Sequence, residues 1–348
     1  MEVHHERRRG ARDRELMLVL GGAGFFRVVV AAHRLGLFTL LAERPGVLRD
    51  DVGPALGLPQ RSVITLLMAC QALGWVERDA AGGLRNAPWV GPALASTSQT
   101  FPSLLEAFDQ LMYGAFEALE TSLREGTNAG LARFPGPGTT LYERLSAHPA
   151  LESVFHAWMS RLSEAGLPQR LVDALTPATH VLDVGGGDGT NAVVLARAYP
   201  HLRVTVLDLP SICERVRARA ADEGLSDRID ARPFDLRHDE LPSGADAVLF
   251  SRIFNIYGEA TNQALVERSF RALPTGGRLV VFPAMVSDDD GAGPLGAAFL
   301  SLYFLNLATG EGRVYAPGDY ERWFARAGFA SFSCEVDERD EAVIVGTK

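Results

Sequence analysis

Hydrophobic residues recur along this chain with two periods, and each period predicts a different kind of element. Through residues 16–165 apolar positions mostly repeat every three or four residues, the spacing of helices that bury one face. From residue 166 to residue 348 short apolar runs of the buried-strand type alternate with helical patterns. Repeated units of this kind predict an α/β fold, with a mainly parallel sheet and helices on both faces.

The α/β part begins with a strand and a helix whose ends are marked in the sequence. Thr190 is expected to cap the first helix, and Pro200 ends it. The expected strands are 181–184, 203–207, 230–232, 247–250 and 279–282, and the expected helices are 190–199, 211–223 and 261–273. Ligands of such folds bind at the carboxyl ends of the strands.

The helical part begins with a charged segment and an apolar one. Residues 1–15 predict a flexible tail, and residues 16–41 predict one or two amphipathic helices. Arg27, His33 and Arg34 interrupt the apolar segment, which therefore predicts neither a signal peptide nor a membrane span. No export and no membrane association are expected.

Residues 43–92 follow a winged-helix outline, with two helices and a hairpin closed around Ala80-Ala81-Gly82-Gly83. Arg61 begins the second helix, where a DNA-binding protein places its recognition residues. That helix continues as the apolar run from Val63 to Met68, and a net charge of -9 supplies no basic face. The pattern therefore does not favour nucleic-acid binding. The apolar stripe of residues 100–124 is typical of core or subunit packing.

The most informative stretch connects a strand, a glycine turn, a helix and an acid. Val181 to Val184 runs directly into Gly185-Gly186-Gly187-Asp188-Gly189, and the next strand ends on Asp208. Glycines let backbone approach a ligand, and a carboxylate roughly 20 residues later can accept two hydrogen bonds from a ribose diol. Asp183 and Asp188 repel phosphate, so an adenosine compound with a cationic or zwitterionic tail is expected rather than a dinucleotide.

At these residues the chain resembles the S-adenosylmethionine-dependent small-molecule methyltransferases, the plant caffeate-type and bacterial antibiotic-tailoring O-methyltransferase family. Val181 to Gly189 is similar to the family's first motif, Asp208-Leu209-Pro210 to its ribose-binding acid, and Asp235-Leu236 to its adenine-side pair. Thr275-Gly276-Gly277-Arg278 resembles its late turn, and the resemblance covers nearly all 348 residues.

The resemblance implies a Rossmann-like class I methyltransferase domain at residues 166–348 and a helical, winged-helix dimerisation domain at residues 16–165. It also implies a homodimer, S-adenosylmethionine as the cofactor, no metal, and a phenolic aromatic acceptor from specialised or antibiotic metabolism. Together with the strand-end positions it points to these cofactor-binding residues: Asp183, Gly185, Gly187, Asp208, Leu209, Asp235, Leu236 and Ser251.

The acceptor side is expected to be built from two segments. Phe155 to Ser160 resembles the family segment that touches cofactor and substrate, and Met159 occupies its substrate-packing position. Between Pro283 and Tyr315 apolar and aromatic residues recur at helical spacing, as small-molecule pockets require. The expected acceptor-binding residues are Met159, Arg252, Tyr303 and Asn306, with Arg252 and Arg313 as a candidate pair for a substrate carboxylate.

The catalytic positions depart from the family pattern. Members commonly carry His-Asp-Trp after the fourth strand, where this chain has Asn255-Ile256-Tyr257. The two supporting acids fall on Pro283 and Val314, and no histidine follows His238. The usual general base is therefore absent. The candidate catalytic residues are Asn255, His156 and Tyr257.

Three hypotheses follow from this departure. In the first, a phenol is O-methylated mainly through proximity and orientation, which supply ~7–11 kcal/mol in favourable cases. In the second, methyl goes to an aromatic carbon ortho to a phenol, on an acceptor of the aromatic amino-acid type. In the third, the cofactor-binding fold serves a non-methylating reaction. The intact cofactor motif favours methyl transfer.

The chain has three isolated cysteines, Cys70, Cys213 and Cys334. Without CxxC spacing they predict free thiols in a reducing cytoplasm and no zinc site.

Overall fold

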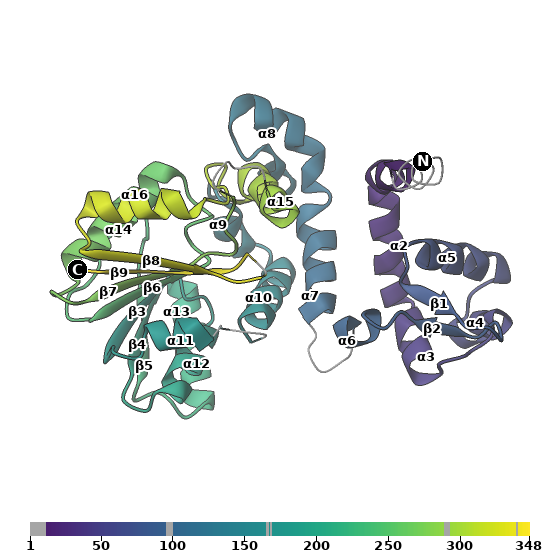
Figure 1. Cartoon of the computed structure of the whole chain (residues 1–348), viewed down its shortest axis with the longest axis horizontal. Helices are drawn as coiled ribbons and strands as arrows, with labels where there is room; N and C mark the ends of the chain where they lie inside the picture. The colour runs from purple at the N-terminus through teal and green to yellow at the C-terminus, as the bar shows by residue number, and fades with distance from the viewer. Residues whose placement is uncertain (1–11, 95–99, 165–166, 168, 289–292, 339) are drawn as a thin grey trace, which may run out of the picture. The chain divides into compact units, whose positions relative to one another are not determined.

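The computed structural model describes residues 12–94, 100–164, 167, 169–288, 293–338 and 340–348 (Figure 1). Contacts divide the chain into two compact units, Met1–Asp109 and Gln110–Lys348. Of the expected tail, residues 1–11 lie outside the described part, as do residues 165 and 166 at the expected domain boundary. The segment from residue 110 to the boundary belongs by its contacts to the second unit, because its helices pack on those of the α/β part.

The first unit consists of short helices and one hairpin. Its elements are α2 (Gly22–Arg34), α3 (Leu37–Glu43), α4 (Arg49–Leu56), α5 (Gln60–Ala72), β1 (Val76–Arg78), β2 (Leu84–Asn86), α6 (Val90–Leu94) and α7 (Thr100–Ala107). The strands pair antiparallel, with Val76 opposite Asn86, as the sequence predicts. Asp79 closes the turn by accepting hydrogen bonds from the amides of Ala81 and Gly83.

The apolar segment at residues 16–41 forms three helices, one more than expected. They are Arg12–Leu20, α2 and α3, and the chain bends at Gly21 between the first two. Among the described residues no single helix has the length and apolar composition needed to cross a membrane. The pair formed by Arg12–Leu20 and Gly22–Arg34, bent by 73°, satisfies the same criteria of length and composition.

A series of short helices opens the second unit and leads to the sheet. The expected continuous helix over residues 100–124 is interrupted, because π and 3₁₀ turns replace its middle. The elements are η1 (Phe108–Met112), η2 (Ala115–Ala118), α8 (Leu119–Glu125), η3 (Ala129–Arg133), α9 (Leu141–Leu145), α10 (Pro149–Glu164) and α11 (Gln169–Ala174). A capping box begins α9, in which Thr140 and Glu143 satisfy each other's amides.

A seven-stranded sheet with the order β5-β4-β3-β6-β7-β9-β8 forms the centre of the second unit. Its strands are β3 (His180–Val184), β4 (Arg203–Asp208), β5 (Ile229–Pro233), β6 (Ala247–Ser251), β7 (Arg278–Phe282), β8 (Ser331–Val336) and β9 (Ala342–Thr347). The first five are parallel, as predicted. Strands β8 and β9 were not predicted; they form an antiparallel pair that extends the sheet from β7.

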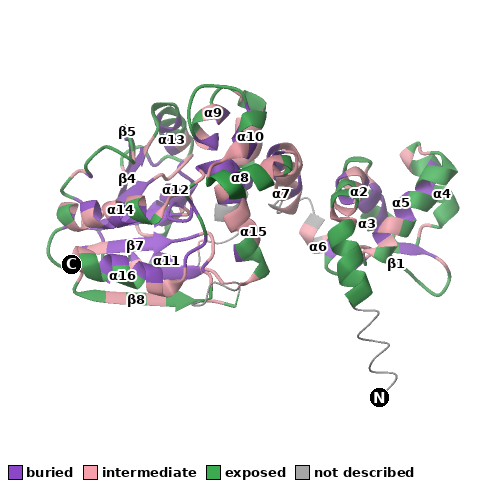
Figure 2. Cartoon of the chain, turned by 90° about the horizontal axis from the view of Figure 1, so that it is seen from above, coloured by how far each residue is buried: buried purple, intermediate pink, exposed green. Residues whose placement is uncertain are grey.

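Two helical layers cover the sheet (Figure 1). One contains α11, α12 (Thr190–Ala198) and α13 (Pro210–Asp222), and the other contains α14 (Glu259–Ala272) and α16 (Pro317–Ala327). Figure 2 shows that the central strands are buried while the outer helix surfaces are exposed. The parallel register brings Val184, Leu207, Ser251 and Phe282 to one edge of the sheet. The residues that follow them therefore share that edge, where the site lies.

Candidate cofactor and acceptor site

The glycine turn after β3 brings backbone unusually close to its neighbours. Gly185 and Gly187 have φ angles of +70° and +59°, a region that glycine adopts without strain. A Cβ on Gly185 would lie 2.4 Å from Cδ1 of Ile253, and one on Gly186 would lie 2.5 Å from Oδ2 of Asp183. The turn therefore requires glycine at these positions.

Asp208 ends β4 with its carboxylate against this turn. The amide of Gly187 donates to Oδ2 at 2.9 Å, and the amide of Leu209 donates to Oδ1 at 2.7 Å. Burial raises the pKa of Asp208 to about 6, and these two backbone hydrogen bonds oppose the rise. Since each carboxylate oxygen can accept a second hydrogen bond, the group is held in place with capacity left for a diol.

Asp183, the fourth residue of β3, is fully buried at the same edge. Burial raises the pKa of its carboxyl to about 7, and the neighbouring charge of Asp208 adds to the rise. Neither carboxylate oxygen has a hydrogen-bond partner among the described residues. An uncompensated buried carboxylate is costly, so the site fits a ligand that brings a cation or hydrogen-bond donors to it.

Two further buried polar atoms at this edge are also without a hydrogen-bond partner in the described part of the chain. They are Oγ of Ser251, at the end of β6, and Oδ1 of Asn191, in the first turn of α12. Buried polar atoms in native proteins normally have partners, in the protein or in a ligand. These two oxygens and the Asp183 carboxylate are therefore the unpartnered polar atoms of this edge of the sheet, which we call the polar edge.

The start of α12 differs from the expectation in one detail. Thr190 is the first helical residue and not the cap, because Gly189 occupies the cap position. The amide of Thr190 donates to Oδ1 of Asp188 at 3.2 Å. Asp188 also forms an ion pair with Arg219 at 3.2 Å, which offsets part of its charge.

The expected adenine-side pair lies in the loop after β5. Asp235 is exposed and accepts hydrogen bonds from the Arg237 amide and the His238 ring. The His238 hydrogen bond is the main cause that lowers the pKa of Asp235. Leu236 is half-buried and packs against the hydrophobic core above the sheet. Both residues therefore follow β5 at the carboxyl edge of the sheet, and their place beside the adenine stays a prediction.

Asn255 is completely buried, and its side-chain amide forms hydrogen bonds with backbone groups of two other segments. Its Oδ1 accepts from the amide of Ala284 at 2.8 Å, and its Nδ2 donates to the carbonyls of Arg313 at 3.3 Å and Met285 at 3.5 Å. This amide therefore joins the loops after β6 and β7 to the segment before α16. Its geometry is that of a positioning residue.

The other two candidate bases lie in different surroundings. His156 is half-buried on α10 and interacts with Arg215, Glu152 and Asp188. Burial is the main cause that lowers the pKa of its ring, and the positive charge of Arg215 adds to this effect. Tyr257 interacts with Arg237, Glu143 and Asp208, and burial raises its pKa. His156 therefore belongs to the surroundings of the glycine turn. The interactions of Tyr257 reach Asp208 at the glycine turn and Glu143 on α9.

The arginines proposed for a substrate carboxylate have partners within the protein. The Arg252 guanidinium lies 5.3 Å from the centre of the Phe282 ring and interacts with Glu341. Arg313 lies over the Tyr315 ring and forms an ion pair with Asp319 at 3.4 Å. Both guanidinium groups therefore have protein partners, and their joint use for a substrate carboxylate stays a prediction.

The segment expected to line the acceptor forms α15 (Leu295–Tyr303) and the π-helical turn η4 (Phe304–Ala308). Asn306 is fully buried, and its amide accepts from the Ser122 hydroxyl at 2.8 Å and donates to the Ala115 carbonyl at 3.0 Å. It therefore fastens η4 to the preceding helices. Tyr303 is buried, and its hydroxyl interacts with that of Tyr142, a residue that the sequence analysis did not single out.

Comparison of the chain with known proteins identifies its family. Residues 116–330 match the family described as the O-methyltransferase domain. The chain is 36% identical to an L-tyrosine C(3)-methyltransferase of Streptomyces lavendulae, over 90% of this chain and 86% of that protein. The chain belongs to the O-methyltransferase domain family. It is a methyltransferase, and S-adenosylmethionine is its cofactor.

Two other relatives of this methyltransferase agree with that assignment. It is 32% identical to a 3-hydroxy-5-methyl-1-naphthoate 3-O-methyltransferase of Streptomyces sahachiroi, over 87% of this chain and 85% of that protein. The apo structure of the S-adenosylmethionine-dependent methyltransferase SibL is 37% identical and superposes with a TM-score of 0.83. That match covers 96% of this chain and 98% of SibL.

In this methyltransferase we expect Asn255 to act on stability rather than as a base. Asn255→Ala should lower the free energy of unfolding by about 2–3 kcal/mol, because buried backbone groups lose their partner. Chemical denaturation monitored by circular dichroism measures this change. Asn255→Asp is the matched variant: it keeps the acceptor for Ala284 but places a carboxylate against two carbonyls. Equal or higher turnover in Asn255→Asp would contradict the positioning role.

Proposed function

We propose that this chain transfers a methyl group from S-adenosylmethionine to the hydroxyl oxygen of a phenolic aromatic small molecule. The observation that carries the proposal has two sides: the polar edge beside the glycine turn, where Asp183 and Ser251 lack partners among the described residues, and the tyrosines Tyr142 and Tyr257. One side suits a cationic nucleoside, and the other suits an aromatic ring with a hydroxyl. The relatives named for tyrosine and a hydroxynaphthoate methylate such rings.

The cofactor side is assigned to residues already positioned by backbone. S-adenosylmethionine, when bound, supplies an electrophilic methyl group on a cationic sulfur. We assign the sugar diol to Asp208 and the cationic amino-acid end to Asp183 and Ser251. Asp235 and Leu236 are assigned to the adenine side, and His156 to the rim of the glycine turn. Ionised carboxylates at two of these positions complement the positive charge of the ligand.

We assign the acceleration of methyl transfer mainly to the proximity and orientation of the acceptor. The three candidate bases are occupied or protonated: backbone groups hold the Asn255 amide, His156 interacts with Arg215, Glu152 and Asp188, and burial raises the pKa of Tyr257. A general base contributes typically ~10²–10⁴-fold, whereas holding reactants in line can supply ~7–11 kcal/mol. Water can take the phenolic proton. Met159, which shares one face of α10 with Phe155, is assigned to packing against the ring.

Methylation at carbon is the second candidate, and one observation favours it. The relative that is 36% identical over 90% of this chain is named for transfer to C3 of L-tyrosine. In that chemistry the phenol activates its ortho carbon, so the same hydroxyl must be recognised. Oxygen and carbon methylation therefore require the same cofactor and acceptor residues. They differ in which atom of the acceptor faces the methyl group.

A phenol panel tests the proposal. We expect L-tyrosine, 3-hydroxy-1-naphthoate or a related phenol, incubated with enzyme and S-adenosylmethionine, to gain one methyl group by mass spectrometry. Phenols with a blocked hydroxyl should gain none. Calorimetry should show S-adenosylmethionine binding at the same time. Cofactor binding with no methylated product from any phenol would overturn the proposed acceptor class.

A pH titration of the product separates oxygen from carbon transfer. A phenol ionises with a pKa near 10 and changes its ultraviolet absorbance when it does so. A methyl ether has no ionisable hydroxyl, and a ring-methylated phenol retains it. We expect the absorbance change to disappear in the product. Its persistence would establish the carbon-methylating alternative.

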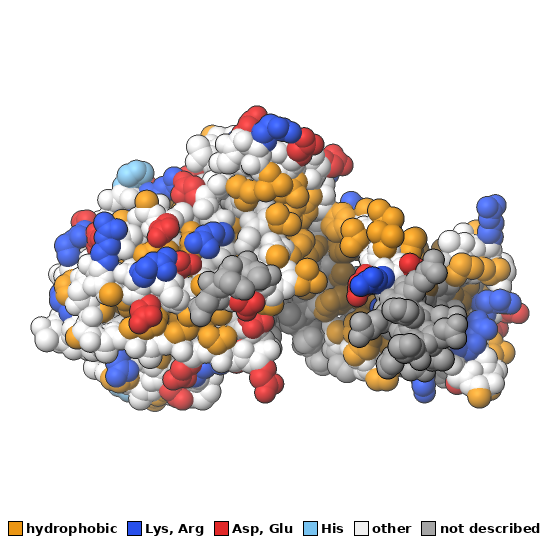
Figure 3. Space-filling model, turned by 45° about the horizontal axis from the view of Figure 1, so that its top comes forward, with side chains coloured by type: hydrophobic (Ala, Val, Ile, Leu, Met, Phe, Trp, Pro, Cys, Tyr) orange, Lys and Arg blue, Asp and Glu red, His pale blue; other side chains and the backbone are white. Residues whose placement is uncertain are grey.

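We propose that the first unit pairs two copies of the chain. Large apolar side chains remain exposed on its helices, including Leu16, Val19, Leu20 and Met68, and Figure 3 shows hydrophobic side chains gathered on this unit. Exposed apolar patches of this kind mark interaction surfaces. The three cysteines are free thiols, which supports the proposed cytoplasmic location.

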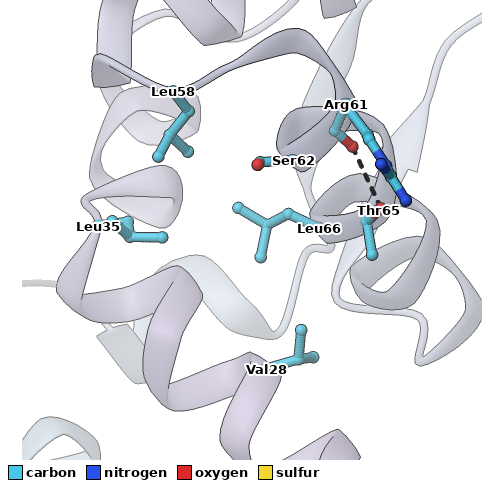
Figure 4. A pocket seen from close by; sticks show the side chains of 7 residues that line it. All are labelled: Val28, Leu35, Leu58, Arg61, Ser62, Thr65 and Leu66. Carbon is cyan, nitrogen blue, oxygen red and sulfur yellow. Dashed lines mark hydrogen bonds between the residues drawn. The ribbon is translucent and has the colours of Figure 1, made fainter.

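The environment of Arg61 favours packing over DNA binding. Arg61 lies at the rim of a pocket of about 340 Å³ between α2 and α5 (Figure 4). The other residues that line it are Val28, Leu35, Leu58, Ser62, Thr65 and Leu66. Because most of these side chains are apolar, the face supports association with another apolar surface. Sedimentation velocity should give the mass of a dimer.

A further inference from the structure

Tyr142 links three helices on the acceptor side of the site. It lies on α9, and its ring packs edge-on against Phe155 of α10 with ring centres 5.7 Å apart. Its hydroxyl interacts with that of Tyr303, which is only 3% exposed at the end of α15. Since α9 also packs on η4, which follows α15, the contact between the two hydroxyls joins neighbouring elements.

Electrostatic interactions and helix packing link this tyrosine pair to the glycine turn. Tyr142 interacts with Tyr257, in the loop after β6. Tyr257 in turn interacts with Asp208, whose carboxylate closes the glycine turn. Packing gives the same link: Tyr142 packs on Phe155 of α10, and α10 packs on α12, the helix that follows the glycine turn.

Both hydroxyls of the pair remain protonated in the physiological range. Burial raises the pKa of Tyr303 to about 12 and raises that of Tyr142 well above its usual value. Groups of this kind cannot remove a proton at neutral pH, but they can donate hydrogen bonds. Two phenols that interact with each other offer one donor hydrogen to a third oxygen.

We propose that Tyr142 and Tyr303 together form the recognition site for the acceptor's hydroxyl group, with Tyr142 as a specificity-determining residue. This inference rests on the proposed phenolic acceptor and adds the residues that recognise the phenol. The buried hydroxyl pair donates to the acceptor oxygen and fixes which edge of the ring faces the cofactor. A ring without that hydroxyl leaves the buried pair without its third partner and binds less well.

The test compares two matched pairs of probes, L-tyrosine with L-phenylalanine and 3-hydroxy-1-naphthoate with 1-naphthoate. Binding to the full-length enzyme is measured by calorimetry with saturating S-adenosylhomocysteine. We expect the wild-type enzyme to prefer at least one hydroxylated probe about tenfold, as expected for one buried hydrogen bond. Tyr142→Phe and Tyr303→Phe should each remove that preference, and the double variant should lose no more than either single variant.

Tyr199→Phe is the matched control, because the Tyr199 hydroxyl contacts Thr176 at the start of the domain and not the site. It should keep the preference, and all variants should bind S-adenosylhomocysteine as the wild type does. Equal loss of affinity for both members of a probe pair would overturn the inference, since it would indicate a packing role. An undiminished preference in Tyr142→Phe, or no preference in the wild type, would also overturn it. Methylation of the phenol panel is judged separately and tests the proposed function alone.

Discussion

Asp208→Asn should weaken S-adenosylmethionine binding about a hundredfold. The carboxylate of Asp208 accepts from the amides of Gly187 and Leu209, one on each oxygen. An asparagine must turn its NH₂ group toward one of these donors. It also removes the negative charge that strengthens hydrogen bonds to a diol. Charge-assisted hydrogen bonds contribute about 1.5–3 kcal/mol each, and about 1.4 kcal/mol corresponds to tenfold in affinity.

Calorimetric titration with S-adenosylmethionine measures this effect directly. Asp230→Asn is the control, because Asp230 is an exposed residue of β5 whose neighbours are Arg217 and Arg232. It should bind the cofactor as the wild type does. A circular dichroism spectrum shows whether the Asp208 variant is folded. Affinity within threefold of the wild type in a folded Asp208→Asn protein would remove this residue from the sugar-binding role.

Cofactor affinity should fall as the pH is lowered from about 7.5 to about 5.5. Burial raises the pKa of Asp183 to about 7 and that of Asp208 to about 6, so both carboxylates take up protons in this range. The ligand's positive charge favours the ionised forms. If Asp183 must be ionised, its titration alone lowers the affinity roughly twentyfold over this range.

The stability of the free protein should change with pH in the opposite sense. The pKa of Asp183 is raised above its usual value of 3.8, so folding takes up a proton between that value and about 7. The free energy of unfolding therefore decreases as the pH rises through this window. Bound cofactor should reverse part of this loss, since it binds the ionised form more tightly.

Asp183→Asn identifies the group responsible for both effects. Calorimetry across the pH series should show weaker cofactor binding at neutral pH and a flatter pH dependence than the wild type has. Thermal unfolding of the free variant should also vary less between pH 5 and pH 8. An unchanged pH dependence of affinity in this variant would assign the titration to another group.

The sequence by itself determined the family, the parallel core of the sheet and the cofactor turn. These features are local: apolar runs predict β3 to β7, and the glycines with Asp208 occur within one strand-helix-strand unit. Backbone sterics require glycine in a turn with positive φ, and that requirement is visible without any distant contact. Of the hairpin that was not predicted, β9 carries a buried apolar run like that of the predicted strands, whereas β8 lies at the sheet edge and is mostly exposed.

Only the tertiary structure decided which polar side chains remain available for chemistry. The amides of Asn255 and Asn306 looked like site residues in sequence, and both are engaged by groups 29 to 191 positions away. Tyr142 had no motif around it, and it meets Phe155 and Tyr303 only because α9 packs on α10 and η4. Periodicity reports which face of an element is buried. The partner that a buried polar group meets depends on how distant segments pack, which local sequence does not encode.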